Sequence, residues 1–372
     1  MGKKETRLLM VTTHSFEGRY WQDIAIDFRN RPEILALLSL NGCDSPKWAG
    51  DNSHIAYFGS TRGAKLKFFH LLSKCRDAIN FRPNVIQTHL FYGGIFGICI
   101  GNILRIPVVV TRHHIDEHFI VGTSLHRYLD RLTIRLADAV IVRSYAAREW
   151  LILNEKGDPK KIFIVNQGFD FCLLEVSQTQ ITRVRSELNL VETDFNVLCV
   201  ARYSQAKGQE YLLKAASLLK TKIPNLRLIF VGPGDSKWLE DLAKEIDNAQ
   251  KIDIFTSRND IPACLAASDL VVHPSLVDSF SQLLIEVQAV GTAVVATDIA
   301  AARQQIIDGV TGLIVKPKDP QELAEAIFRV YKDPDLRKSM GIAGFQHVRK
   351  QFQVKKMVEE DLKVVQLVLN YK

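Results

Sequence analysis

Two carboxylates, Asp278 and Glu286, lie eight residues apart around the expected start of a helix. The residues between them read as a loop that runs into a helix, because Ser279 and Gln282 have the spacing of a capping box. An inward-facing apolar stripe follows, formed by Leu283, Leu284, Val287 and Val290. Gly291 is expected to end the helix, and a buried parallel strand is expected after it. The pattern predicts a loop, a helix and a strand, with one carboxylate before the helix and one on it.

The first turn of this expected helix could hold an anion. Backbone N–H groups at a helix start have no partner within the helix, and the helix dipole is positive there. Glu286 would lie about 7–8 Å along the axis from Ser281, at about 1.5 Å per residue. A diphosphate and a ribose fit that span, and a carboxylate at the border of the apolar stripe needs a hydroxyl partner. The alternatives are that Asp278 is only a helix-start residue and that Glu286 points into solvent.

Two cations follow an earlier expected strand, residues 196–200. Arg202 and Lys207 lie in the loop at its carboxyl end, just before an expected helix at residues 210–219. An arginine fork and a lysine point charge complement a diphosphate, and they would stabilise the negative charge that grows as it departs. Ligands of open α/β sheets bind at the carboxyl ends of strands, so cations and carboxylates are expected at one sheet edge. The alternative is two surface cations on a turn.

Other polar or glycine residues also follow expected strands. Gly232, in the sequence VGPGD, is expected to bring the backbone close to a ligand, although Gly-Pro-Gly is also a common turn. Gly18 lies in the turn after the first strand, and His89 and His113 follow two later ones. One histidine of the His113–His114 pair is expected to donate a hydrogen bond to a sugar or a phosphate. We expect no metal here, because adjacent histidines on an extended segment point to opposite sides.

Apolar runs alternate with longer amphipathic stretches in two series, which is the pattern of repeated βαβ units. With 372 residues, the chain suits two domains that each have a core. We therefore expect an α/β protein with two facing, Rossmann-like, doubly wound domains and a cleft between them. The expected ranges are 1–177 and 178–351, with a linker without strand pattern at 172–182.

Composition narrows the classes of protein. Hydrophobic residues make up 47% and charged residues 24% of the chain, as in ordinary globular proteins. The six cysteines are scattered without CxxC spacing, which indicates neither a disulfide framework nor a zinc site and fits a reducing cytoplasm. No leader and no apolar run of about 18 residues is evident, so we expect a cytoplasmic protein.

The net charge of +7 is concentrated in the N-terminal half, where residues 51–115 carry 8 basic and 2 acidic side chains. Within this range, residues 62–76 resemble a basic amphipathic helix, which could bind an anionic membrane surface at the inner face. The alternative is an ordinary helix that covers a sheet and keeps its lysines in solvent. Nucleic acid is not expected as a partner, because the arginines are spread out and no reading motif accompanies them.

Five segments together resemble glycosyltransferase family 4, the retaining, nucleotide-sugar-dependent enzymes with the GT-B fold. They are VARYSQAKG at 200–208, LIFVGPGD at 228–235, residues 273–298, DGVTGLIV at 308–315 and KIFIVNQGFD at 161–170. The N-terminal half is similar more loosely, through Gly18, His89, His113 and residues 166–168. The resemblance implies a donor domain in the C-terminal half and an acceptor domain in the N-terminal half, onto which the final helix, 352–372, returns.

The resemblance also implies roles for individual residues. Asp278 would bind the transferred sugar, Glu286 the ribose, and Arg202 and Lys207 the pyrophosphate, while His113 would lie beside the sugar. The donor-binding loop and helix start would add Ser279, Phe280, Ser281 and Gln282, whose amides reach the distal phosphate. The chain departs from the family in having Asp where a Glu is usual and no glycines after it, so its contact with the sugar is shorter.

The reaction implied is transfer of a sugar from a nucleotide-diphosphate donor to a hydroxyl of a saccharide or lipid-linked acceptor, with retained configuration. Cell-surface glycan or glycolipid synthesis is the expected setting, and no metal or other cofactor is required if the two cations replace it. The alternatives are a nucleotide-sugar epimerase of the same fold and a catalytically silent nucleotide-sugar-binding subunit. A dinucleotide oxidoreductase is not favoured, because its G-x-G-x-x-G sequence is absent after the first strand.

Overall fold

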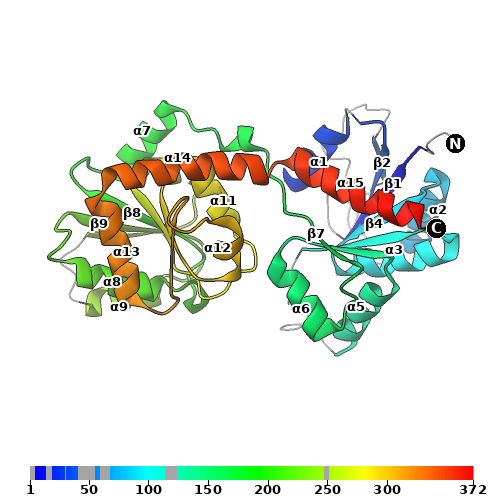
Figure 1. The fold of residues 1–372 in the computed structure, drawn as a ribbon, viewed down its shortest axis with the longest axis horizontal. Coiled ribbons are helices and arrows are strands. Elements are labelled where there is room, and N and C mark those ends of the chain that lie inside the picture. Colours follow the sequence, from blue (N-terminus) through cyan, green and yellow to red (C-terminus); the bar gives the residue numbers. More distant parts are fainter. Residues whose placement is uncertain are drawn as a thin grey trace. The chain divides into compact units, whose positions relative to one another are not determined.

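The computed structural model describes residues 5–13, 19–29, 31–40, 55–58, 68–113, 124–246 and 251–371. It divides into two α/β units, the first coloured from blue to green with a red final helix, and the second from green to orange in Figure 1. The N-terminal unit is Met1–Asp170 with Phe352–Lys372, and the C-terminal unit is Phe171–Gln351. Each unit is built on its own parallel sheet.

The sheet of the N-terminal unit has seven parallel strands in the order β3-β2-β1-β4-β5-β6-β7. The strands are β1 Arg7–Thr12, β2 Ile34–Ser39, β3 Ile55–Phe58, β4 Val85–His89, β5 Val108–Arg112, β6 Ala139–Val142 and β7 Ile162–Ile164. The helices of this unit are α1 Arg19–Phe28, α2 Phe68–Phe81, α3 Phe91–Leu104, α5 Ser124–Leu136, α6 Tyr145–Glu155 and α15 Val354–Asn370. The strand order reverses between β1 and β4, as in doubly wound folds.

Helices cover both faces of this sheet (Figure 1). Buried side chains of α1 and α15 pack with one set of alternate strand residues, and those of α2, α3, α5 and α6 pack with the other. The strands are therefore apolar on both faces, which explains their continuous hydrophobic runs.

The final helix α15 belongs to the N-terminal unit and is anchored there by a buried ion pair. Arg143, which follows β6, donates from its two terminal nitrogens to the two carboxylate oxygens of Asp361, at 3.1 and 3.0 Å. The two side chains are only 3% and 5% exposed. Gln87 on β4 also donates to Asp361, at 3.4 Å. A buried charge pair of this kind depends on both partners, so it ties the end of the chain to the first sheet.

The C-terminal unit has a six-stranded parallel sheet in the order β10-β9-β8-β11-β12-β13. Its strands are β8 Phe195–Val200, β9 Leu226–Val231, β10 Lys251–Phe255, β11 Leu270–His273, β12 Val294–Thr297 and β13 Leu313–Val315. Its α-helices are α7 Gln178–Glu187, α8 Gln209–Leu219, α9 Lys237–Glu245, α10 Ile261–Ala267, α11 Gln282–Ala289, α12 Ala300–Gln305, α13 Pro320–Lys332 and α14 Pro334–Gln351, and two short 3₁₀ helices are η1 Phe171–Leu174 and η2 Gln205–Lys207. One face of the sheet packs with α8, α9 and α13, and the other with α7, α10, α11 and α12.

Several elements differ from the sequence expectations. Strands β2 and β3 and helix α14 were not expected, and the supposed linker at 172–182 contains η1 and the start of α7. Helix α7 begins with a capping box, in which the Ser177 hydroxyl accepts from the Gln180 backbone and the Gln180 side chain accepts from the Ser177 backbone. None of the described helices is long and apolar enough to span a bilayer.

Candidate active site

The strand order of the C-terminal sheet reverses between β8 and β11, which lie side by side with Leu270 opposite Val197. In an open α/β sheet, loops that leave two such strands at their carboxyl ends diverge and form a binding crevice. The β8 loop carries the two expected cations, and the β11 loop carries the first expected carboxylate. The topology therefore brings these oppositely charged groups to one place.

A tight packing of two backbones shapes the β8 loop. A Cβ placed on Gly232, just after β9, would lie 1.9 Å from the carbonyl oxygen of Ala201, so only glycine fits there. The amide of Tyr203 donates to the Pro233 carbonyl at 2.9 Å, and its hydroxyl donates to the Phe255 carbonyl at 2.6 Å. The glycine-rich turn after β9 thus holds the backbone on both sides of residue 202, and its expected closeness to a ligand stays a prediction.

A second backbone contact joins the β8 loop to the β11 loop. Gly208 has a φ of +65°, and a Cβ there would lie 2.0 Å from the Pro274 carbonyl oxygen. The amide of Leu276 donates to the Ala206 carbonyl at 2.9 Å. The two loops are therefore held together on either side of Lys207 by contacts that a side chain on Gly208 would prevent.

Lys207 and Asp278 meet directly. The Lys207 ammonium nitrogen Nζ lies 3.1 Å from Oδ2 of Asp278, and the side chains are 27% and 21% exposed. The side chain of Arg202, in contrast, is exposed and forms no ion pair with any residue in the described ranges. The expected cation and the expected sugar-binding carboxylate thus share one site, with a second cation in the same loop.

His273, the last residue of β11, lies beneath this ion pair. Its Nε2 is 3.9 Å from Oδ2 of Asp278, and its side chain is only 3% exposed. Burial, and to a lesser extent the nearby Lys207, lower the pKa of His273 to about 4, although Asp278 opposes the shift. The imidazole is therefore neutral at pH 7 and keeps one N–H donor. No role for this residue was predicted from the sequence, because a lone histidine at a strand end does not indicate a particular function.

The helix start at α11 differs from the expected capping box. Helix α11 begins at Gln282, so Ser281 is the N-cap residue where Ser279 had been expected. The Ser281 side chain forms no capping hydrogen bond with the described residues. Instead, the buried side chain of Gln305 accepts from the Ser281 amide at 3.1 Å and donates to the Ser281 carbonyl at 3.0 Å. The expectation of a Ser279–Gln282 box was wrong because a residue from α12 already holds the backbone there.

Two consequences follow for the anion site at this helix. The Ser281 amide is occupied by Gln305, so it is not open to a phosphate in this conformation. The amides of the first turn, at Gln282 and the next residue, have no acceptor within the helix. Helix α12 also fixes the loop before α11, since the amide of Ala301 donates to the Asp278 carbonyl at 3.1 Å. The loop that carries the first carboxylate is thus held at both ends by α12.

The second carboxylate lies on the same helix. Glu286 is half-buried, and its Oε1 accepts from the side-chain amide of Gln282 at 2.8 Å. This hydrogen bond to an amide one turn earlier orients the carboxylate. Gly291, with a φ of +78°, follows the end of α11 as expected.

In the N-terminal unit, the two expected histidines meet at the carboxyl edge of β4 and β5. Nδ1 of His89 lies 2.9 Å from Nε2 of His113, and Trp21 contacts the His89 ring edge-on. Burial, and then repulsion from His113 and Arg143, lower the pKa of His89 well below its usual value. A neutral, buried His89 therefore orients the half-buried His113. Arg112, next to it, is held by Asp130 and by Glu155, the latter at 2.8 Å.

Some expected residues lie outside the described ranges, namely Gly18, His114 and residues 62–67 of the basic stretch. Within that stretch, the Lys74 side chain is only 2% exposed. Its Nζ lies 3.6 Å from Asp77 and donates to the Phe58 carbonyl at 3.3 Å, and burial lowers its pKa. Both interpretations of the stretch had placed its lysines at a surface, either against a membrane or in solvent. Lys74 is instead buried. Among the described residues, no group of three or more His, Cys, Asp or Glu side chains could hold a metal ion.

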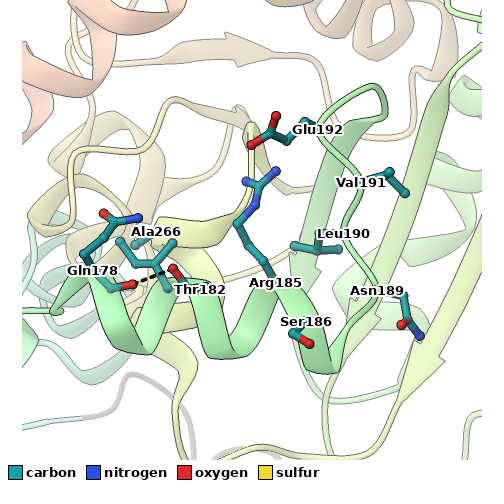
Figure 2. Close-up of a pocket in the computed structure, with 10 residues that line it drawn as sticks. Gln178, Thr182, Arg185, Ser186, Asn189, Leu190, Val191, Glu192 and Ala266 are labelled. Atoms are coloured by element: carbon teal, nitrogen blue, oxygen red, sulfur yellow. Dashed lines mark hydrogen bonds between the residues drawn. The ribbon is translucent and has the colours of Figure 1, made fainter.

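An open cavity of about 890 Å³ lies elsewhere in the C-terminal unit. Figure 2 shows that its lining comes largely from α7 and from Asn189 to Glu192, which precede β8. The guanidinium of Arg185 lies among these residues and donates to the Ala267 carbonyl at 3.0 Å. The cavity therefore lies at the amino end of β8, away from the carboxyl-end loops, and includes neither Lys207 nor Asp278.

Comparison with known proteins agrees with this geometry. Residues 180–347 match the model of glycosyl transferases group 1, and residues 42–171 match that of glycosyltransferase family 4. A D-inositol 3-phosphate glycosyltransferase from Corynebacterium glutamicum is 27% identical over 284 residues, which cover 72% of this chain and 68% of the relative.

Two solved structures share the fold. Anabaena HepE in complex with UDP has a TM-score of 0.79 and 22% identity, and the match covers 97% of this chain and all of that one. A glycosyltransferase from Rickettsia africae has a TM-score of 0.77 and 18% identity, with 99% of this chain covered and all of that one. The chain is thus a glycosyltransferase with the GT-B fold, whose N-terminal half matches the family 4 model and whose C-terminal half matches the group 1 model.

Proposed function

We propose that this enzyme transfers a sugar, with retained configuration, from a uridine diphosphate sugar to a hydroxyl of a saccharide or lipid-linked acceptor. Cell-surface glycan or glycolipid synthesis is the proposed setting. The observation that carries the proposal is the meeting of Lys207 and Asp278 at the switch point of the second sheet, beside the start of α11. One cation, one carboxylate and helix amides that have no acceptor within the helix are what a diphosphate attached to a sugar requires.

The proposed contacts follow the chemistry of each group. Arg202, exposed and without an ion pair among the described residues, and Lys207 bind the diphosphate, together with the first amides of α11. Glu286, which is held by Gln282, accepts from ribose hydroxyls, and Asp278 accepts from the sugar. On the N-terminal unit, which binds the acceptor, His113 donates to the sugar or phosphate. The two cations supply the charge that a metal would otherwise provide.

During the reaction, the bond between the sugar's anomeric carbon and the β-phosphate oxygen breaks, and a bond to the acceptor oxygen forms. The anomeric carbon becomes oxocarbenium-like, and negative charge grows on the departing diphosphate. Arg202, Lys207 and the helix amides stabilise that charge more strongly in the transition state than in the ground state. The acceptor approaches from the face that the diphosphate leaves, and its proton passes to the diphosphate, which retains the configuration.

Uridine is proposed as the base because Anabaena HepE was solved with UDP and with UDP-glucose. A thermal-shift series with UDP, GDP, ADP and their glucose conjugates tests this choice, since a selective ligand raises the melting temperature by mass action. We expect the largest shift with UDP compounds. Nuclear magnetic resonance of the product then reads the anomeric configuration. Inverted product, or no shift with any nucleotide, would contradict the proposal.

A further inference from the structure

His273 is a buried side chain whose polar atoms have no evident structural use. Neither of its ring nitrogens has a hydrogen-bond partner in the part of the chain that the structure describes, and the side chain is 3% exposed. A buried polar group without a partner costs stability, and proteins leave few such groups. An apolar residue of similar size would pack at this position without that cost. The position therefore calls for a function of the imidazole itself.

The geometry points to Asp278 as the group on which it acts. Oδ2 of Asp278 lies 3.1 Å from Nζ of Lys207 and 3.9 Å from Nε2 of His273. One carboxylate oxygen thus has a cation at hydrogen-bond distance and an imidazole about 1 Å beyond that distance. A small rotation of either side chain would bring the imidazole into a hydrogen bond with the same oxygen.

We propose that His273 is a positioning residue, which takes over Asp278 by a hydrogen bond from its ring when the donor's diphosphate draws Lys207 away. The proposal rests on the donor site described under Proposed function. It adds an exchange of the hydrogen-bond partner of Asp278. Lys207, which the diphosphate needs, is replaced by the neutral His273, which the diphosphate does not need.

The exchange answers a conflict in the site. Lys207 and Asp278 neutralise each other, yet the diphosphate needs the ammonium and the sugar needs the carboxylate. Once Lys207 has turned to the diphosphate, Asp278 would face the ligand without a partner to fix its rotamer. His273 is neutral and cannot hold the diphosphate itself, but its N–H can hold the carboxylate in the orientation that accepts from a sugar hydroxyl.

The test compares two ligands that differ only in the sugar. Isothermal titration calorimetry gives the Kd of UDP, which has the diphosphate but no sugar, and of UDP-glucose, for the full chain and for His273→Leu and His273→Gln. We expect UDP to bind all three within about twofold. His273→Leu should reduce the preference for UDP-glucose over UDP by about tenfold, the ratio that corresponds to one charge-assisted hydrogen bond. His273→Gln should restore part of it, because its amide can donate.

A double-mutant cycle locates the effect. In an Asp278→Asn background, His273→Leu should have little further effect on the preference, since the carboxylate on which it acts is gone. Ser275→Ala is the matched control, because the Ser275 hydroxyl is also buried and without a partner among the described residues. This control should leave both Kd values unchanged. His273→Leu should melt at the same or a higher temperature than the parent, which a structural role of the ring would not allow.

Two outcomes overturn the proposal in different ways. If the effects of His273→Leu and Asp278→Asn simply add, or if His273→Leu leaves the preference for the sugar intact, the exchange is wrong while the donor site stands. If Lys207→Met leaves the Kd of UDP unchanged, the donor site itself is wrong, and the exchange falls with it.

Discussion

Lys207 and Asp278 form an ion pair with 3.1 Å between Nζ and Oδ2, although 71 positions separate them in the sequence. Because both side chains are about a quarter exposed, such a pair contributes at most about 1 kcal/mol. The contact is therefore strong enough to orient two charged groups and weak enough for a charged ligand to separate them.

Substitution of either cation should slow the reaction. Arg202→Ala and Lys207→Ala are expected to lower kcat/KM for the uridine diphosphate sugar by about 10²-fold, because each removes a charge that stabilises the leaving diphosphate. Steady-state kinetics measures this loss. Lys214→Ala, on the neighbouring helix α8, is the control, since Lys214 is 44% exposed and pairs with Glu210 of the same helix. Near-normal kcat/KM in both variants would reject the assigned roles.

Replacement of Gln305 should weaken donor binding, and the loss of protein stability alone should not account for that effect. Gln305→Leu leaves the Ser281 amide and carbonyl without their partners, at a cost of about 1–3 kcal/mol, and loosens the loop that carries Asp278. We expect a donor KM about tenfold higher, which corresponds to about 1.4 kcal/mol.

Gln288→Met is the matched control for this experiment. Gln288 is also fully buried, and its side chain donates to the carbonyls of Leu284 and Gln305, so its loss should lower the melting temperature similarly. Among the described residues, its side chain forms no hydrogen bond with Asp278 or Ser281, so the donor KM of the variant should stay near that of the parent. Equal changes in KM for both variants would show that Gln305 acts only through stability.

Stability should fall in mild acid because of His273. The pKa of this residue is lowered to about 4, whereas an unfolded histidine titrates near ~6.5. Between these values the unfolded chain binds a proton that the folded chain does not, so stability decreases as the pH falls from about 6.5 to about 4 and then levels off. The loss amounts to about 1.4 kcal/mol per unit of pKa difference.

The measurement is the melting temperature from pH 4 to pH 8 for the parent and for His273→Leu. The difference between the two curves isolates the contribution of His273 from those of other titrating groups, such as His89 in the other unit. The variant should gain on the parent steadily as the pH falls. Parallel curves would mean that His273 is protonated or exposed in the folded protein.

The buried ion pair of the N-terminal unit should be essential for its stability. Asp361→Asn removes the carboxylate charge that pairs with the buried Arg143 guanidinium, and breaking a buried ion pair typically costs about 3–5 kcal/mol. We expect a clear loss in the urea midpoint of the unfolding transition. Glu359→Gln, on the same helix, removes an exposed carboxylate 3.8 Å from Arg31 and should change it little. A similar small effect in both variants would show that the pair does not anchor α15.

The glycine-rich turn after β9 should be needed for UDP binding. Gly232→Ala places a methyl group against the Ala201 carbonyl, so the backbone next to Arg202 must shift. We expect weaker binding of UDP, measured by calorimetry, as well as a lower melting temperature. Ala substitution at Pro233, whose side chain is exposed, is the control in the same turn. Unchanged UDP binding in Gly232→Ala would separate this turn from the position of the cation.

Local patterns in the sequence were sufficient for much of the fold. The strands at 226–231 and 270–273 were predicted at their observed limits, because strands buried on both faces are continuous apolar runs bounded by polar or turn residues. Strand β2 was missed, since its run continues into Leu40 and periodicity alone does not distinguish such a run from a buried helix. Helix α14 was missed because its apolar residues form no pronounced stripe.

Helix capping could not be predicted from local sequence patterns alone. The spacing at Ser279 and Gln282 and the spacing at Ser177 and Gln180 are the same, yet only the second pair forms a capping box. At the first, Gln305 reaches the backbone from a helix that comes 24 residues later. A competing partner from a distant element decides such a case, and no local pattern contains it.

The sequence by itself determined which charged groups follow which strands, because the order of residues along the chain places Arg202 and Lys207 after one strand and Asp278 after another. Only the tertiary structure decided which of these groups touch. Three features depend on strand order and on packing across many residues. They are the pairing of β8 with β11, the close backbone contact at Gly208 and the burial of His273. Side-chain burial and contacts between distant segments arise from that packing, and hydrophobic periodicity does not encode them.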